Sequence, residues 1–398
     1  MALVDLWRKS PEQISGKNVQ QIVAFAGDGK LTDGNLASQE FRTFLAQVPS
    51  SWLIRYASEC LGNSFVNSGL VLQDSVNEIG NRIGFRVSHG RYRGVTGQLG
   101  YDGLWESADG HALVVEVKTT DAYRIDLNTI ANYRRGLIKS EKLSEEHSSI
   151  LIVVGRQDTG DLEAQIRGSR HAWDVRLIST DALVRHLTVK EELEDPRIQE
   201  QIHAVLRPRE FTRLDDIVDL LFSTTEDIKQ DQVSVADSAA LSDTDEDEGK
   251  DRKPKFTPVA FHDACIRRLE KVLGTHLIKR SRTAFASSDR PIRVICAVSR
   301  EHARSGSRSY WFAFHPHQEE FLRGAKETYA AFGCGSESQL LIIPFTEFSK
   351  WLVGMNETSN EGRSYRHVSI SRTQNRFELV RRHGFPRIDV TQYLIDTP

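Results

Sequence analysis

Two apolar stretches with a helical pattern between them constrain the fold of this chain most. Residues 148–155, SSILIVVG, are continuously apolar, which is typical of a central strand buried on both faces. Residues 111–118, HALVVEVK, predict another strand. The intervening residues 125–138 predict a helix whose apolar face comprises Leu127, Ile130 and Leu137. A strand, a helix and a strand in this order predict a sheet flanked by helices.

The neighbouring segments extend this pattern. Residues 70–85 predict a helix that Gly84 ends, with an apolar stripe of Leu72, Val76, Ile79 and Ile83. Two strands are expected next, at 85–94 and 101–107. After residue 155 we expect a helix, a strand and a helix, at 160–170, 174–180 and 181–187. The fold class is therefore α/β, with a small mixed sheet, and the first 65 or so residues show mainly helical spacing.

Residues 223–255 differ in composition from the rest of the chain. They contain no aromatic residue, few large apolar ones, and the acidic block DTDEDE. Such a stretch cannot bury enough surface to offset its ordering entropy, so we predict a flexible linker. The predicted organisation is a helical N-terminal segment, a first domain, the linker and a second domain, at residues 1–65, 66–222, 223–255 and 256–398.

The second domain is predicted to be an independent α+β domain. It begins with a helix at 261–274. Strands are expected at 290–300, 309–316 and 338–345. Helices are expected around 320–332 and 346–355, and a hairpin at 365–382.

Composition narrows the class of protein. Hydrophobic residues make up 39% and charged residues 27%, which is ordinary for a soluble globular protein. No apolar run approaches the roughly 20 residues that span a bilayer, and the first residues lack the apolar core of a secretion signal. The cysteines show no zinc-binding spacing, so we expect free thiols in the cytoplasm at Cys60, Cys265, Cys296 and Cys334.

The net charge of -3 conceals an asymmetry between the two halves of the chain. From Arg252 to the end there are 24 Lys and Arg against 14 Asp and Glu, an excess of ten positive charges. The preceding residues hold the other 28 basic and 41 acidic groups. A basic domain favours a polyanionic partner, and a solvated arginine-rich surface is the alternative.

Charged side chains lie at the end of the strand 111–118. Because successive side chains in a strand alternate, Glu116 and Lys118 share one face with Val114. Asp102 begins the preceding predicted strand. If the two strands form a hairpin through the turn at 108–110, Asp102 comes close to Glu116, so two carboxylates and one ammonium group converge.

This trio suits phosphodiester hydrolysis with Mg²⁺. Mg²⁺ takes oxygen ligands, which Asp102, Glu116 and the carbonyl group of Val117 could supply. The cation would polarise a phosphate and lower the pKa of a water molecule. Lys118 would orient that water or stabilise the charge that develops on the phosphate. The alternative is a surface Glu–Lys pair on an edge strand, which would have no chemical role.

These residues resemble the PD-(D/E)-x-K nuclease superfamily, which has the restriction-endonuclease-like fold. Asp102 and Glu116-Val117-Lys118 match its motif, with Tyr101 in place of the proline. Over residues 70–187 the pattern is most similar to Mrr-like restriction endonucleases. There a helix carries an acidic residue and an apolar stripe before a glycine-aromatic pair. Gln73 takes the acidic position, so the resemblance implies that Gln73 ligands the metal or holds a water beside it.

Other residues are candidates for contact with DNA. Basic side chains can bind phosphates, and a solvated surface is the alternative. These candidates are Arg167, Ser169, Arg170, Lys279, Arg280, Arg282, Arg381 and Arg382. Further groups of the site are expected just beyond the motif, at Asp121, Tyr123, Asn132 and Tyr133. The aromatic residues at 310–317 could stack on bases, although we expect most of them to be core, because alternation gives a core strand the same appearance.

The predicted function is a Mg²⁺-dependent DNA endonuclease of the restriction or phage-defence type. Its substrate would be double-stranded DNA, and a double-strand cut needs two active sites, which favours a homodimer. A methyltransferase is a candidate partner, and no membrane association is expected. Two alternatives are a repair or recombination nuclease that acts on structured or damaged DNA, and a DNA-binding protein without catalytic activity.

Overall fold

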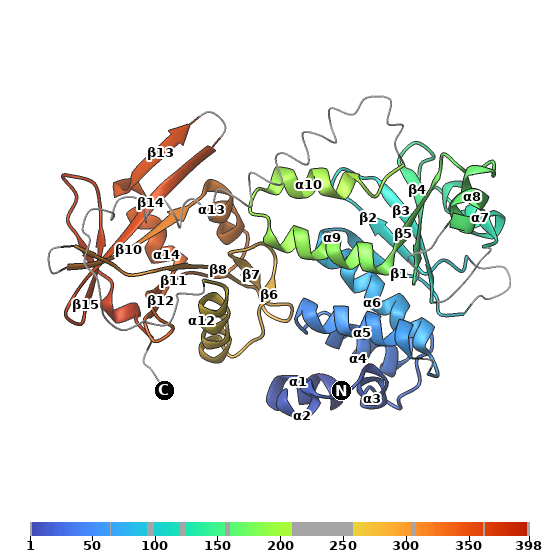
Figure 1. The fold of residues 1–398 in the computed structure, drawn as a ribbon, viewed down its shortest axis with the longest axis horizontal. Helices are drawn as coiled ribbons and strands as arrows, with labels where there is room; N and C mark the ends of the chain where they lie inside the picture. The colour runs from blue at the N-terminus through green and yellow to red at the C-terminus, as the bar shows by residue number, and fades with distance from the viewer. Residues whose placement is uncertain are drawn as a thin grey trace, which may run out of the picture. The chain divides into compact units, whose positions relative to one another are not determined.

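The computed structural model describes residues 2–63, 65–93, 99–119, 125–155, 160–208, 258–304, 307–360 and 363–395 (Figure 1). The chain divides into two compact units, residues 1–224 and 225–398. Both combine helices with β-sheets, which confirms the α/β class in its broad sense. The predicted linker at 223–255 lies outside the described residues. Within the described ranges, no helix has both the length and the apolar character to cross a membrane.

The first unit begins with five helices, which confirms the helical spacing of this segment. They are α1 (Ala2–Lys9), α2 (Glu12–Ser15), α3 (Val19–Ala24), α4 (Leu36–Leu45) and α5 (Ser50–Gly62). Their buried side chains, such as Phe41 and Tyr56, share one hydrophobic core with Leu72 and Val76 of the following helix. The helical segment is therefore packed onto the rest of the unit, because its apolar faces are buried there.

The sheet of the first unit has five strands in the order β1-β2-β3-β4-β5. The first three strands pair antiparallel and the last three parallel. In chain order the elements are α6 (Ser68–Ile83), β1 (Arg86–His89), β2 (Gly103–Glu106), β3 (Ala112–Lys118), α7 (Leu127–Lys139), β4 (Ser148–Val154), α8 (Gly160–Arg167), β5 (Val175–Ser179), α9 (Thr180–Glu192) and α10 (Pro196–Ala204). From α6 to α9 this is the predicted order, and all seven residues of β4 are buried, as expected for a central strand.

Helices cover both faces of this sheet. Leu113 and Val115 of β3 join the core that contains α6, whereas Val114 joins a second core with Ile130 of α7 and Leu162 of α8. The alternation of β3 thus directs one set of side chains toward α6 and the other toward α7. This separation decides which side chains can meet at the end of β3.

The second unit contains two sheets with a hydrophobic core that draws on both of them. One has the order β16-β15-β14-β10-β9, with β13 paired to β14, and the other has the order β12-β11-β8-β7-β6. The helices are α12 (Pro258–Leu273), α13 (Pro316–Arg323) and α14 (Phe345–Trp351), with short 3₁₀ turns at Leu352–Gly354 and Thr391–Tyr393. The strands are β6 (Ile278–Lys279), β7 (Ala284–Ala286), β8 (Ile292–Ser299), β9 (His302–Arg304), β10 (Ser307–Phe314), β11 (Glu327–Cys334), β12 (Leu340–Pro344), β13 (Asn356–Asn360), β14 (Arg363–Thr373), β15 (Arg376–Val380) and β16 (Ile388–Asp389).

One element of the second unit corrects the sequence interpretation. The helix predicted around 320–332 ends at Arg323, and Glu327–Cys334 is the strand β11. This strand lies between β8, to which it is parallel, and β12, to which it is antiparallel. Ala330 and Ala331 raised the helical propensity of the segment, but burial between two strands overrides a weak local preference. The predicted helix α12, the strands β8, β10 and β12, and the β14–β15 hairpin are confirmed.

Candidate active site

Asp102, Glu116 and Lys118 come together at the end of the β2–β3 hairpin. The register pairs Gly103 with Val115, so Asp102 stands opposite Glu116, as the hairpin interpretation predicted. The N–H of Asp102 donates to the carbonyl of Val115 at 3.1 Å, and the N–H of Val117 donates to Oδ2 of Asp102 at 2.7 Å. These bonds hold the carboxylate of Asp102 against the end of β3.

Lys118 balances only part of the negative charge of Asp102 and Glu116. Nζ of Lys118 lies 2.5 Å from Oε1 of Glu116. Glu116 is 8% exposed, and its other oxygen, Oε2, is buried without a hydrogen-bond partner among the described residues. Burial and the negative charge of Glu116 raise the pKa of Asp102 to about 7, although the N–H of Val117 and the charge of Lys118 oppose this shift. Burial lowers the pKa of Lys118, but the Glu116 carboxylate outweighs burial and raises it overall.

Tyr133 of α7 belongs to the surroundings of this trio. Its ring packs against the core between the sheet and α7. Its pKa is raised by burial first and then by the negative charge of Glu116, which places the hydroxyl within electrostatic reach of the carboxylates. Asn132, on the same helix, is exposed. Asp121 and Tyr123 lie outside the described residues.

The donor set fits a small divalent cation. Within the described ranges, no group of three or more His, Cys, Asp or Glu side chains is placed to hold a metal ion. The residues fit instead a site with few protein ligands. The carboxylates of Asp102 and Glu116 face each other, and Oε2 of Glu116 is buried without a described hydrogen-bond donor. A hard cation such as Mg²⁺ commonly uses one or two carboxylates together with water and phosphate oxygens. It would also relieve the repulsion from Glu116 that, after burial, raises the pKa of Asp102.

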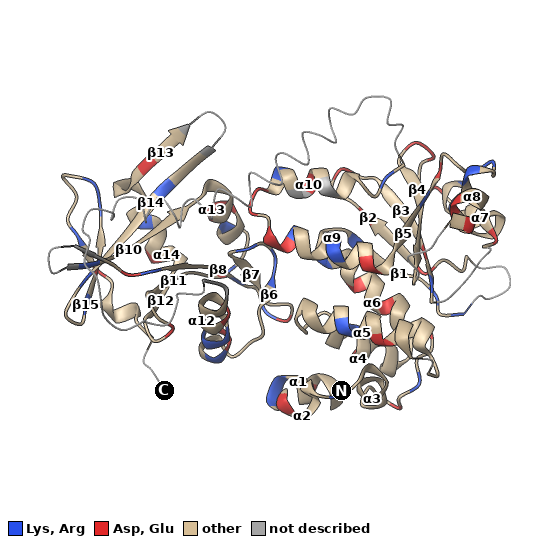
Figure 2. Cartoon of the chain, in the orientation of Figure 1, with Lys and Arg blue, Asp and Glu red and all other residues tan. Residues whose placement is uncertain are grey.

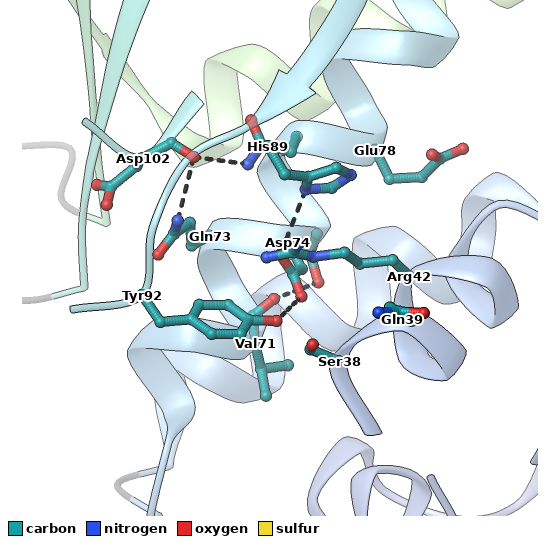
Figure 3. Close-up of polar contacts among 12 residues, drawn as sticks. Ser38, Gln39, Arg42, Val71, Gln73, Asp74, Glu78, His89, Tyr92 and Asp102 are labelled. Carbon is teal, nitrogen blue, oxygen red and sulfur yellow. Dashed lines mark hydrogen bonds and ion pairs between the residues drawn. The ribbon is translucent and has the colours of Figure 1, made fainter. Parts of the chain in front are cut away.

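Gln73 contacts the main chain of Asp102, on the side away from the Asp102 carboxylate (Figure 3). Its amide nitrogen, Nε2, donates to the main-chain carbonyls of Asp102, at 3.1 Å, and of Arg91, at 3.4 Å. Figure 3 shows the carbonyl of Asp102 facing Gln73 while the carboxylate points away. Asn77, one turn further along α6, donates to the same carbonyl at 3.0 Å. The sequence analysis did not single out Asn77, although its spacing of four residues from Gln73 places both on one helical face.

A buried ionic network lies next to Gln73 on α6. Asp74 is fully buried, and its carboxylate pairs with Nε of Arg42 at 2.9 Å and lies 3.5 Å from Nδ1 of His89 (Figure 3). The hydroxyl of Tyr92 also donates to Asp74, and the Arg42 guanidinium stacks 4.7 Å from the centre of the Tyr92 ring. Burial first, and then the charge of Asp74, raises the pKa of Tyr92 well above its usual value. This network joins α4 and α6 to the chain segment at residues 89–92.

The predicted DNA contacts of the first unit make no contact with the trio among the described residues. Arg167 ends α8, and the chain then enters β5 at the edge where the parallel strands begin, whereas Glu116 and Lys118 lie near the end of β3. Oγ of Ser169 donates to the carbonyl of Ile166 at 2.8 Å, which is a local turn contact. Arg170 is exposed and donates to Asn128 at 3.1 Å. These residues are not brought to the trio, and DNA contact by them stays a prediction.

The predicted basic residues of the second unit already have contacts within the protein. Lys279, Arg280 and Arg282 are half-buried, and each interacts with other groups of the chain. Arg381 donates to the carbonyl of Pro386 at 3.0 and 2.8 Å, and its guanidinium and that of Arg382 lie 5.3 and 4.9 Å from the Phe385 ring. Lys and Arg positions also recur on α12 and β14 (Figure 2).

The aromatic segment of β10 divides between two faces of its sheet. Tyr310, Phe312 and Phe314 are buried in the core, which confirms the expectation for most of the aromatics. Trp311 lies on the other face and is half-buried, with its ring centre 6.2 Å from that of Tyr365 and 5.6 Å from that of His367. The indole N–H of Trp311 donates to Nδ1 of His367 at 3.0 Å. The imidazole ring of His367 is therefore in the neutral form, with its proton on Nε2.

No protein-family model and no curated protein matches this chain. A function therefore has to be inferred from its own residues.

Proposed function

We propose that the chain is a Mg²⁺-dependent DNA endonuclease whose active site comprises Asp102, Glu116 and Lys118. The observation that carries this proposal is the pairing of β2 with β3, which sets the half-buried carboxylate of Asp102 opposite the buried carboxylate of Glu116, beside a lysine. The element order from α6 to β5 supports the restriction-endonuclease-like core that the resemblance implies. A purely structural Glu–Lys pair would leave the facing Asp102, with its raised pKa, without a role.

The residues of the chain have separate tasks in this proposal. Asp102 and Glu116 would hold the cation through carboxylate oxygens, and the carbonyl of Val117 is a further candidate ligand. When bound, Mg²⁺ would polarise the phosphate and lower the pKa of the attacking water. Lys118 is about one-third exposed in its side chain, so its ammonium group can reach substrate. It would orient the water or stabilise the negative charge that grows on the phosphate oxygens.

The second unit would supply recognition of DNA. Its region of the chain has an excess of ten positive charges from Arg252 onward, which favours binding to a phosphate backbone. The half-buried aromatic group of Trp311, Tyr365 and His367 could stack on bases. Double-stranded DNA as substrate, a homodimer that cuts both strands and a role in restriction or phage defence complete the proposal, with a methyltransferase as candidate partner.

A panel of DNA substrates tests this proposal. Full-length protein is incubated with unmethylated plasmid, methylated plasmid and branched duplex DNA, each with Mg²⁺ and with EDTA, and the ends are mapped. Cleavage of plasmid at fixed sites, only with Mg²⁺, is the expected result. Cleavage of branched DNA alone would replace restriction with repair or recombination, and binding without cleavage of any substrate would contradict the enzymatic proposal.

A further inference from the structure

Three hydrogen-bond donors converge on the main-chain carbonyl of Asp102. Two come from α6: Nε2 of Gln73 at 3.1 Å and Nδ2 of Asn77 at 3.0 Å. The third is the N–H of Gly90 at 3.0 Å. A carbonyl oxygen has two lone pairs, so three donors use its full capacity to accept hydrogen bonds. The backbone of Asp102 is therefore held more firmly than strand pairing alone would hold it.

The orientation of both amide groups follows from their other contacts. Nε1 of Trp105 lies 2.9 Å from Oδ1 of Asn77, and because an indole N–H can only donate, the nitrogen of Asn77 must face Asp102. Nε2 of Gln73 also donates to the carbonyl of Arg91 at 3.4 Å. Both protons of the Gln73 amide thus point at main-chain oxygens.

The surroundings are shaped for this contact. Gln73 is 3% exposed and Asn77 is fully buried. A Cβ atom on Gly103 would lie 2.2 Å from Oδ1 of Asn77, and one on Gly90 would lie 1.8 Å from the carbonyl oxygen of Tyr101. Only glycine at these two positions lets α6 and the end of β1 approach Asp102 so closely.

We propose that Gln73 and Asn77 are positioning residues for Asp102 and that Gln73 is not a metal ligand. They hold the main chain so that the carboxylate turns away from α6, toward Val117 and Glu116. An acidic side chain at position 73 would have no proton to donate and would face the carbonyl oxygens of Arg91 and Asp102. Glutamine rather than an acid is therefore the residue that this contact requires. The inference rests on the proposed function only where it names Asp102 as a metal ligand.

Two matched substitutions separate positioning from ligation. Q73E and N77D each replace a donating amide with a carboxylate that faces the same carbonyl. Positioning predicts that both weaken Mn²⁺ binding by about tenfold or more in calorimetry, as loss of groups that orient a ligand usually does. Ligation by residue 73 predicts the reverse for Q73E, which would bind Mn²⁺ more tightly. Q39E, an amide-to-acid change at an exposed position of α4, is the control for added charge and should bind Mn²⁺ as the wild type does.

A second readout needs neither metal nor activity. In the metal-free protein the protection of the Val117 amide against hydrogen exchange is measured by NMR, because this N–H donates to Oδ2 of Asp102. Q73M has a similar size but donates no hydrogen bond. If Gln73 positions Asp102, Q73M loosens this carboxylate and lowers the protection of the Val117 amide, while the other amides of β3 keep theirs. Unchanged protection of the Val117 amide in both Q73M and N77D would overturn the inference, as would tighter Mn²⁺ binding by Q73E.

The two proposals can fail separately. If the wild type neither binds Mn²⁺ nor cuts DNA, the proposed function fails, whereas the protection of the Val117 amide still tests the positioning role. If Q73E does not fold, Q73M and N77D decide between positioning and ligation through the same exchange measurement.

Discussion

The N–H of Val117 donates a 2.7 Å hydrogen bond to Oδ2 of Asp102 across the β2–β3 hairpin. This bond favours the ionised carboxylate, whereas burial and the facing Glu116 disfavour it more strongly, so the pKa of Asp102 rises to about 7. The metal-free site consequently holds a proton at a pH at which most aspartates have lost theirs. Two carboxylates in this state are suited to exchange a proton for a divalent cation.

The first prediction concerns stability against pH. The unfolded chain releases the proton of Asp102 near pH 4, whereas the folded protein keeps it up to about pH 7. Between these values the folded state binds more protons, so its stability falls as pH rises, by up to about 1.4 kcal/mol per pH unit. D102N should lose this slope in urea unfolding experiments at pH 4 to 8. Equal slopes in wild type and D102N would show that Asp102 has an ordinary pKa.

The second prediction uses Mg²⁺ with the same variants. Because ionised Asp102 binds the cation better than protonated Asp102, Mg²⁺ should raise the melting temperature of the wild type more at pH 8 than at pH 5. D102N should show little Mg²⁺ effect at either pH. E106Q is the matched control. Glu106 is the last residue of β2, the strand that Asp102 precedes, and it forms a surface ion pair with Arg86 at 3.5 Å. E106Q should respond to Mg²⁺ as the wild type does.

Lys118 supports a third prediction. K118M removes the ammonium group next to Glu116 but leaves the fold intact, because the side chain is partly exposed. Loss of one group that stabilises developing charge typically lowers a rate about 100-fold or more. We expect that loss in single-turnover DNA cleavage, with DNA affinity unchanged. K118R keeps a cation at this position and should retain more activity than K118M, and equal rates for K118M and wild type would remove Lys118 from the mechanism.

The ionic network around Asp74 gives a prediction about stability. D74N leaves the Arg42 guanidinium without its buried counter-charge, and breaking such a pair typically costs about 3–5 kcal/mol. E106Q breaks the exposed pair with Arg86 and should cost less than about 1 kcal/mol. Chemical denaturation of both variants at pH 7 makes the comparison. If both lose the same small amount, the Asp74 network does not hold α4 and α6 together.

Substitutions at two adjacent residues of β10 should separate effects on DNA binding from effects on the stability of the second unit. Phe312 is 3% exposed in the core, so F312A should reduce the free energy of unfolding of that unit by about 3–5 kcal/mol. Trp311 lies on the opposite face and is half-buried, with a hydrogen bond to His367, so W311A should cost clearly less stability than F312A. If Trp311 stacks on a base, W311A should weaken DNA binding by about 1–3 kcal/mol in fluorescence anisotropy. Unaltered DNA affinity in a folded W311A protein would exclude this face from recognition.

Local pattern was sufficient to predict the first unit in outline. The apolar runs of β3 and β4 and the stripe on α6 each reflect burial against a neighbouring element, and periodicity reports burial directly. The meeting of Asp102 with Glu116 was also predictable, because a short turn between two strands determines their register.

Other features depend on contacts between distant parts of the chain. The hydrogen bonds to the carbonyl of Asp102 form only if α6 packs with Gln73 and Asn77 facing the start of β2. No local pattern encodes that approach. The strand β11 contains alanines that favour a helix in isolation, and only its place between β8 and β12 makes it a strand. Similarly, Arg167 and Arg170 belong to the helix expected at 160–170, but only the structure shows that Arg170 contacts Asn128 of α7 rather than the trio.

The most direct test of the central claim is single-turnover cleavage of plasmid DNA by the wild type, D102N and E106Q, each with Mg²⁺ and with EDTA. The wild type and E106Q should cut at similar rates with Mg²⁺ and not with EDTA, while D102N should still bind DNA but cut it about 100-fold more slowly or not at all. Full cleavage by D102N, or cleavage by the wild type in EDTA, would contradict a metal-dependent site built on Asp102 and Glu116.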